Sequence, residues 1–243
     1  MGSKTKLVTF THRLSGYGTH SYRAQVAKKG KVPAATSKTV GVMALPAPPT
    51  APFATQSTGY SYSCAITTVG ALYCWGENRF SQLGLGNTVT VWGPVRVGTD
   101  STWAMVDAGE SHTCAITTGG ELYCWGLNDR GQLGQGDKTR RAAPTRVGSA
   151  THWASVSVGA YHTCAITTSG ALYCWGEGSG AQLGVGDQND RLVPTQVGSS
   201  TWRAVATGEV HSCGIRTTGT LYCWGYNDNG QVGLGSIPGV VIP

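Results

Sequence analysis

The stretch SHTCAITTGGELYCWG at residues 111–126 decides the fold, because it occurs three more times with little change. The other copies are SYSCAITTVGALYCWG at 61–76, YHTCAITTSGALYCWG at 161–176 and VHSCGIRTTGTLYCWG at 210–225. Self-similarity with a period of about fifty residues indicates a repeat protein, in which each copy is one structural unit.

Each copy reads as a β-hairpin, because apolar and polar residues alternate on both sides of a Gly-containing turn. In the second copy, a three-residue loop that ends in a left-handed Gly120 sets the register. Ile116 then lies opposite Leu122. In the same register Cys114 faces Cys124, so that both cysteines share a side with the two apolar residues.

Two further strand signals accompany each hairpin. One starts at Trp103, Trp153 and Trp202, shortly before the hairpins, and a short Pro-containing segment such as 144–147 precedes it. Four short strands in about fifty residues are typical of one blade of a β-propeller. A composition of 36 Gly, 8 Trp and 10 Tyr with 12% charged residues also favours short strands and turns. We expect an all-β fold with four blades at 58–243.

The motifs of the repeat match a known pattern. They are Thr113-Cys-Ala-Ile-Thr, Leu122-Tyr-Cys-Trp-Gly and Gly131-Gln-Leu-Gly in the second copy, with counterparts over residues 58–243. This repeat resembles that of the regulator of chromosome condensation family. The resemblance implies a seven-bladed propeller, of which four copies make an incomplete ring. The cysteines depart from the family's commonest pattern, which has an aliphatic residue first and a small or polar residue second.

A shorter resemblance concerns the start of the chain. Segments 14–26 and 37–42 resemble the last strands of a fibronectin type III domain, and 45–57 is a Pro/Ala-rich linker. Half a β-sandwich cannot bury its own sheet, so we expect residues 1–44 to be the end of a truncated domain. Residues 240–243 would likewise interrupt a repeat.

All eight cysteines lie in the hairpins. Directly opposed residues at a non-hydrogen-bonded site have Cα atoms about 4.5 Å apart, which a disulfide tolerates. We predict four disulfides, namely Cys64–Cys74, Cys114–Cys124, Cys164–Cys174 and Cys213–Cys223. The alternative is reduced cysteine that packs as a small apolar residue. Disulfides would indicate an extracellular or cell-surface protein, whereas reduced cysteine would suit the cytoplasm.

The sequence predicts no catalytic site, metal site or cofactor. Zinc sites and thioredoxin-like redox sites need closely spaced cysteines such as C-x-x-C, which this chain lacks. His112, His162 and His211 recur from copy to copy, whereas a catalytic base normally occurs once beside a distinct partner. We interpret them, with the repeated tryptophans, as packing elements between blades. The Asn128-Asp129-Arg130-Gly131 loop resembles a calcium loop without its spaced carboxylates, and turn formation explains it better.

Charge and hydropathy limit the classes of partner. The net charge of +6 arises in residues 1–60, which hold eight Lys or Arg and no acidic residue. The repeats therefore lack the positive face of a nucleic-acid-binding protein, and nucleic acid is not expected as a partner. No apolar stretch reaches the eighteen residues of a membrane helix, so we expect no membrane insertion.

Binding is expected where the copies differ, because loops on a rigid scaffold commonly carry function. The candidate residues are Phe80, Trp92, Arg130, Lys138, Arg140, Arg141, Asp190, Arg191 and Tyr226. The cations at 138–141 would suit an acidic partner, and the alternative is a solvated surface. We expect a non-catalytic protein-interaction module of a secreted or cell-surface bacterial protein, with a protein partner first and a glycan second. The family resemblance implies two alternatives, which are guanine-nucleotide exchange on a small GTPase such as Ran and inhibition of an extracellular enzyme.

Overall fold

The computed structural model describes residues 6–13, 19–26, 49–233 and 240–241. Every regular element among them is a β-strand, in agreement with the predicted all-β class. The chain divides into two units, Met1–Pro48 and Pro49–Pro243. The described residues include no helix with the length and apolar character needed to cross a membrane.

The first unit contains one antiparallel pair, β1 (Lys6–Arg13) and β2 (Thr19–Val26). Their register runs without a shift from Lys6 opposite Val26 to Arg13 opposite Thr19. The expected fibronectin-like strand at 37–42 lies outside the described residues. The fibronectin type III resemblance and the boundary at residue 44 therefore stay predictions.

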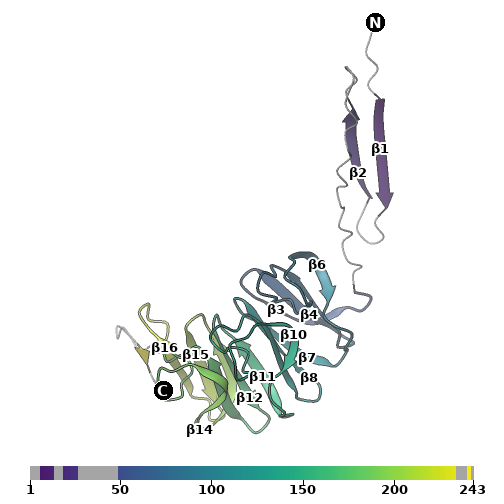
Figure 1. Cartoon of the computed structure of the whole chain (residues 1–243). Coiled ribbons are helices and arrows are strands. Elements are labelled where there is room, and N and C mark those ends of the chain that lie inside the picture. The colour runs from purple at the N-terminus through teal and green to yellow at the C-terminus, as the bar shows by residue number, and fades with distance from the viewer. Residues whose placement is uncertain (1–5, 14–18, 27–48, 234–239, 242–243) are drawn as a thin grey trace. The chain divides into compact units, whose positions relative to one another are not determined.

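The second unit consists of four antiparallel blades that follow one another side by side (Figure 1). Blade 1 contains β3 (Phe53–Thr58), β4 (Tyr62–Thr67), β5 (Leu72–Gly76) and β6 (Val91–Arg96). Blade 2 contains β7 (Trp103–Ala108), β8 (His112–Thr117), β9 (Leu122–Gly126) and β10 (Arg141–Arg146). Blade 3 begins with β11 (Trp153–Val158), β12 (His162–Thr167) and β13 (Ala171–Gly176).

One long strand, β14 (Arg191–Thr207), joins blades 3 and 4. Its first part pairs with β13 as the outer strand of blade 3, and its second part pairs with β15 as the inner strand of blade 4. Blade 4 continues with β15 (His211–Arg216), β16 (Leu221–Tyr226) and β17 (Val240–Val241). Each blade is thus a simple meander, in which every strand lies beside its neighbour in the chain.

The grouping of the strands differs from the sequence expectation in two places. The Pro-containing segment near 144–147 was expected to open a blade, but β10 pairs with β9 and closes the blade before it. Hydrophobic patterning locates a strand without saying which neighbour it pairs with, and this explains the difference. The first blade also begins at Phe53, inside the segment expected as linker. The sequence did not reveal this strand, because the largely exposed β3 lacks the Trp that marks the other inner strands.

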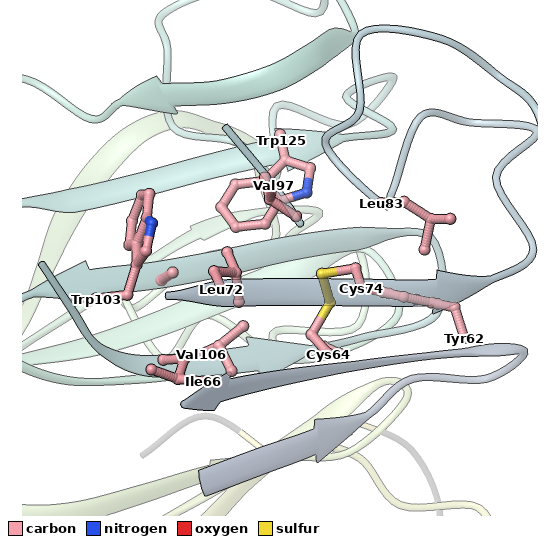
Figure 2. Close-up of a cluster of buried hydrophobic side chains, with 12 residues drawn as sticks. Tyr62, Cys64, Ile66, Leu72, Cys74, Leu83, Val97, Trp103, Val106 and Trp125 are labelled. Atoms are coloured by element: carbon pink, nitrogen blue, oxygen red, sulfur yellow. A yellow bond between two sulfur atoms is a disulfide. The ribbon is translucent and has the colours of Figure 1, made fainter. Parts of the chain in front are cut away.

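The hairpins have the predicted register, with Cys114 opposite Cys124 and Ile116 opposite Leu122. All four predicted disulfides are present, with Cα atoms 4.0 to 4.1 Å apart. The disulfides of blades 1, 2 and 3 each lie in a hydrophobic cluster that extends into the next blade. Figure 2 shows Cys64 and Cys74 of blade 1 in the same cluster as Trp103 and Trp125 of blade 2.

The repeated tryptophans of blades 2 to 4 therefore fill the space between blades, as predicted, whereas Trp75 of blade 1 is only half-buried. Trp175 belongs to the cluster around the blade 2 disulfide, and Trp224 belongs to the cluster around the blade 3 disulfide. A buried indole contributes a large apolar area, so each boundary between blades is stabilised mainly by hydrophobic burial. The core is divided among the boundaries rather than collected in one centre.

Candidate functional site

Two sets of loops lie on one side of the blades, because antiparallel strands alternate in direction along each meander. The inner turns join the first and second strands, at 59–61, 109–111, 159–161 and 208–210. The long loops follow the third strands, at 77–90, 127–140, 177–190 and from 227. Backbone hydrogen bonds connect the two sets, for example 3.0 Å from the Glu77 amide to the Ser61 carbonyl. We call this side the loop face.

The inner turns surround a hollow of about 620 Å³ on the loop face. Neighbouring turns touch through their backbones, since the Tyr60 amide donates to the Gly109 carbonyl at 3.1 Å. A Cβ atom on Gly109 would lie 2.2 Å from the Gly159 carbonyl oxygen, so this close approach requires glycine. The residue after the glycine of each inner turn also lines the hollow. Its identity varies between blades, with glutamate in two of them; the four residues are Tyr60, Glu110, Ala160 and Glu209.

Sequence reasoning missed these hollow-lining residues. Tyr60 is 84% exposed and Glu110 is half-buried, yet both follow a glycine that recurs in every copy. Adjacency to repeated positions made them look like part of the scaffold. Their variation from copy to copy could have marked them as candidate binding residues. That they meet at one hollow could not be predicted, because it depends on how the blades pack around the inner turns.

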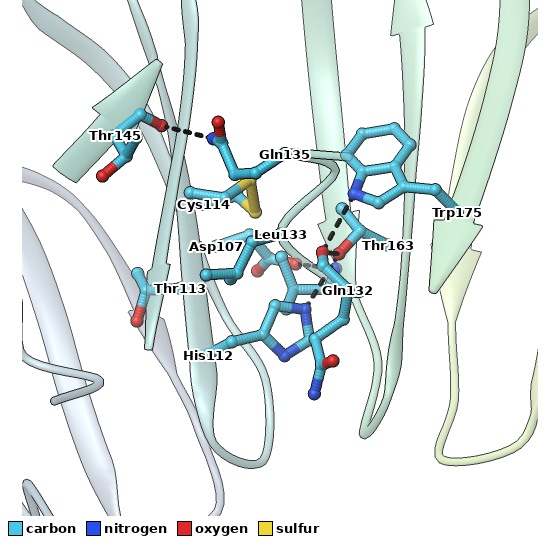
Figure 3. The surroundings of a disulfide bond; sticks show 12 residues. Asp107, His112, Thr113, Cys114, Gln132, Leu133, Gln135, Thr145, Thr163 and Trp175 are labelled. Atoms are coloured by element: carbon cyan, nitrogen blue, oxygen red, sulfur yellow. Dashed lines mark hydrogen bonds between the residues drawn. A yellow bond between two sulfur atoms is a disulfide. The ribbon is translucent and has the colours of Figure 1, made fainter. Parts of the chain in front are cut away.

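A chain of polar contacts crosses each boundary between blades. Figure 3 shows the contacts between blades 2 and 3. At the boundary between blades 2 and 3, the Thr163 hydroxyl and the Trp175 indole both donate to the Gln132 carbonyl at 2.9 Å. Because the hydroxyl has a single proton, it accepts from His112, whose Nε2 lies 2.8 Å away. His112 is therefore the neutral tautomer with its proton on Nε2.

Burial lowers the pKa of His112 to about 3, with a smaller contribution from the nearby His162. His162 repeats the arrangement one blade later, with Nε2 2.9 Å from the Ser212 hydroxyl and its pKa lowered to about 3, first by burial and then by His211. Both imidazoles are fully buried and stay neutral at physiological pH. Their geometry matches the predicted packing role and does not suit a base that must reach a substrate.

Blade 1 uses a tyrosine at the position of these histidines. The Tyr62 hydroxyl donates to the His112 carbonyl at 2.6 Å and lies 2.8 Å from the Thr113 hydroxyl. Burial raises the pKa of Tyr62 above its usual value. The phenol therefore remains protonated and extends the same line of contacts to the first boundary.

A second line of hydrogen bonds joins the inner strands. Ser57 donates its hydroxyl proton to Asp107 at 2.8 Å, and the Val158 amide donates to the other carboxylate oxygen at 2.7 Å. Burial raises the pKa of Asp107, while these donors act in the opposite direction. Asp107 thus bridges three blades, and its oxygens are occupied by the scaffold.

The structure places the sequence-predicted partner residues in two regions. Trp92 lies on the outer strand β6 of blade 1 and is 81% exposed. The others lie on the long loops or at the strand ends beside them, on the loop face; they are Phe80, Arg130, Lys138, Arg140, Arg141, Asp190, Arg191 and Tyr226. Their role in binding a partner stays a prediction.

The cations at 138–141 are largely neutralised by neighbours. Lys138 forms an ion pair with Asp190 at 3.2 Å, and Arg141 forms one with Asp137 at 2.6 Å. The hydrogen bond from Arg141 also holds the pKa of Asp137 below its usual value. Arg140 donates to the Arg79 carbonyl at 3.2 Å and has no carboxylate partner within the described ranges. The cluster therefore offers less positive charge to an acidic partner than its sequence indicates.

Acidic groups surround the part of the loop face near Tyr161. The pKa of Tyr161 is raised first by the negative charge of Glu110, then by partial burial and by Asp129 and Glu177, against the opposing charge of Arg130. Arg130 also contacts Glu177 at 3.7 Å. Among the described residues, no group of three or more His, Cys, Asp or Glu is arranged to hold a metal.

The model described as RCC1-like domain matches residues 11–241. The chain belongs to the RCC1-like family. No curated protein sequence matches this RCC1-like chain.

Solved structures share the fold of this RCC1-like chain. Yeast RCC1 (Prp20), crystallised with Kap60, is 22% identical with a TM-score of 0.71 over 82% of this chain and 50% of that one. Prp20p from Saccharomyces cerevisiae, in a second structure, gives 23% identity and a TM-score of 0.71 over 82% and 52%. Human WBSCR16 gives 24% identity and a TM-score of 0.67 over 79% and 52%. The chain thus spans about half the length of these proteins.

Proposed function

We propose that the loop face is a protein-binding surface and that the protein acts without catalysis. One observation carries the proposal. The polar side chains that repeat are used in contacts between blades, as His112 and Thr163 are, whereas the side chains that vary line the hollow and its surrounding loops. A rigid scaffold that displays variable loops is the usual design of a binding module.

The related fold in yeast supports a protein partner. Prp20 was crystallised with Kap60, and its binding to Gsp1p and to histones has been described. The acidic groups Glu110 and Glu209 at the hollow favour a partner that presents a Lys or Arg side chain there. The paired cations at 138–141 argue against an acidic partner on the neighbouring loops.

The four disulfides favour an oxidising compartment, and we propose a secreted or cell-surface protein of bacterial type. Cytosolic reductants would act against disulfides in all four blades. Intact-mass analysis of protein alkylated at harvest, without added reductant, tests this proposal. Free thiols in material taken from its natural compartment would overturn it.

Photo-crosslinking tests the binding surface. A benzoylphenylalanine at position 60, on the loop face, should capture a protein from an extract of the encoding organism. The same residue at position 69, in the exposed β4–β5 turn on the opposite side, is the matched control. Glu110→Lys with Glu209→Lys should weaken the capture at position 60. Equal capture from positions 60 and 69, or capture indifferent to the charge reversal, would refute the proposal.

Nucleotide exchange on a small GTPase is the second candidate function, because Prp20p has been studied for its binding to Gsp1p. Exchange would also use surface contacts and no internal catalytic group. Release of a fluorescent nucleotide from a Ran-type GTPase, measured with and without this chain, separates the two functions. Acceleration of release would replace the proposed simple binding role with an exchange role.

A further inference from the structure

Polar side chains join the long loop of blade 2 to the outer strand of the same blade. The Gln135 side-chain amide donates to the carbonyls of Thr145 and Arg146 on β10, at 3.2 and 3.1 Å. Figure 3 shows the first of these bonds. The ion pair between Asp137 and Arg141, at 2.6 Å, fixes the same loop to the start of β10. The space between loop and strand is therefore bridged by side chains of the blade itself.

Blade 1 has a groove at the equivalent place. The groove has a volume of about 620 Å³ and lies between the long loop and β6 of blade 1 on one side and β10 of blade 2 on the other. Four positions that are polar in blade 2 are apolar here; Gln135, Thr139, Arg141 and Thr145 correspond to Leu85, Val89, Val91 and Val95. We call this space the outer groove. It shares no lining residue with the hollow at the inner turns, so it is a separate site.

The loop that forms one wall of the outer groove is held by its own contacts. Asn87 Nδ2 donates to the Leu85 carbonyl at 3.2 Å, and Asn87 Oδ1 accepts from the Val89 amide at 2.9 Å. The Gly86 amide donates to the Ala142 carbonyl of blade 2 at 2.9 Å. Both walls of the outer groove thus belong to blades that the structure describes, and the groove is formed without a ligand.

The outer groove leaves backbone acceptors without the side-chain donor that blade 2 supplies. Leu85 has no amide that could reach the Val95 and Arg96 carbonyls as Gln135 reaches their counterparts, and no other side chain of the described ranges donates to them. β6 is also the edge strand of its sheet. An edge strand is a template for a further extended chain, whose amide N–H groups can donate to it.

A cation lies beside these apolar side chains. Arg96 lines the outer groove, and its Nη2 donates to the Ser101 hydroxyl at 2.8 Å. Its counterpart Arg146 contacts the Glu121 carboxylate at 3.5 Å, but the position of Glu121 is Ala71 in blade 1. Within the described part of the chain, Arg96 forms no ion pair. Its positive charge is therefore available to a ligand.

We propose that the outer groove binds an extended peptide segment of a partner protein, in which an apolar side chain stands next to a carboxylate. The apolar side chain packs on Leu85 and Val91. A backbone amide of the segment donates to the Val95 or Arg96 carbonyl, and the carboxylate pairs with the Arg96 guanidinium. Blade 2 already makes both polar contacts internally, with a side-chain amide and a side-chain carboxylate of its own. A fatty acid would supply the carboxylate without the amide donor, and this difference favours a peptide.

Fluorescence anisotropy of labelled peptides, titrated with the whole chain, tests the proposal. The probe is a short fluorescein-labelled peptide of alternating leucine and glutamate. In two comparison peptides, glutamine replaces the glutamates or serine replaces the leucines. The leucine–glutamate peptide should bind with a saturable curve, the leucine–glutamine peptide more weakly, and the serine–glutamate peptide not at all. Excess decanoate should leave the bound probe in place.

Variants of the outer groove locate the binding site. Leu85→Gln gives blade 1 the side chain that blade 2 carries, and it should weaken binding of the leucine–glutamate peptide by about tenfold, because an apolar contact is lost and the backbone acceptors are taken. Val185→Gln makes the same change at the equivalent half-buried residue of blade 3 and should leave the affinity unchanged. Arg96→Gln should abolish the preference for glutamate over glutamine in the probe.

Three results would overturn the proposal. The first is the absence of saturable binding at the highest soluble concentration of the chain. The second is an equal loss of affinity in Leu85→Gln and Val185→Gln, which would place the binding elsewhere. The third is displacement of the probe by decanoate, which would assign the groove to an acyl carboxylate. Circular dichroism checks the fold of each variant, and Val89→Ser, at a side chain that is 53% exposed, provides a groove variant that should lose affinity without losing structure.

Discussion

His112 on β8 donates through Nε2 to the hydroxyl of Thr163 on β12, 2.8 Å away across the boundary between two blades. The hydroxyl in turn donates a hydrogen bond to the Gln132 carbonyl at 2.9 Å. A repeated histidine thereby orients a repeated hydroxyl, and the pair secures the loop that carries Gln132. The contact explains why these histidines belong to the scaffold and why their replacement should reduce stability.

Thr163→Val should destabilise the protein by about 1–3 kcal/mol, because it leaves the buried Nε2–H of His112 without an acceptor. The change keeps the shape of the side chain, so little of the loss reflects packing. Urea unfolding followed by tryptophan fluorescence measures the difference. Thr168→Val, at an exposed threonine of the same blade, is the control and should change the free energy of unfolding little. Equal effects of the two variants would contradict the assignment.

Stability should fall as the pH is lowered from about 6.5 towards 3. The pKa values of His112 and His162 are lowered by burial from 6.5 to about 3, so in this range the unfolded chain binds two protons that the folded chain does not. Each histidine then contributes a slope of about 1.4 kcal/mol per pH unit. Urea unfolding at several pH values gives the slope. His112→Gln with His162→Gln should flatten it, and an unchanged slope in the double variant would refute the explanation.

Gly109→Ala should destabilise the inner turns, because the new Cβ would lie 2.2 Å from the Gly159 carbonyl oxygen. Overpacking of this kind costs about 1–3 kcal/mol. Gly119→Ala is the matched control, since its Cβ would come no closer than 3.6 Å to any neighbour. Melting temperatures of the two variants should therefore diverge. A Gly109→Ala chain as stable as the Gly119→Ala chain would mean that the turns are not in contact.

The disulfides should contribute to stability in every blade. Cys114→Ala with Cys124→Ala should reduce the free energy of unfolding by about 2–3 kcal/mol, because the unfolded chain gains the freedom of a short open loop. Iodoacetamide should label none of the eight cysteines in denatured, unreduced protein and all eight after reduction. Labelling without reduction would show that the pairs are not formed.

The sequence predicted the unit of the fold in detail. The spacing of Cys114 and Cys124 around Gly120 was sufficient for the hairpin register and the disulfide, because both depend on a local turn. The repetition of His112 and His162 was also sufficient to predict their place in the contacts between blades. Local geometry repeats with the sequence, so whatever depends on one hairpin could be derived from one copy.

The contacts between repeats could be identified only from the tertiary structure. Which blade takes the Pro-containing strand, and which carboxylates pair with Lys138 and Arg141, depend on neighbours that periodicity does not identify. Tyr60, Glu110 and Glu209 come together at one hollow only because the inner turns pack side by side. The sequence by itself thus determined the hairpins and their disulfides, which are local, whereas the loop face and the blade boundaries arise from contacts between residues some fifty positions apart.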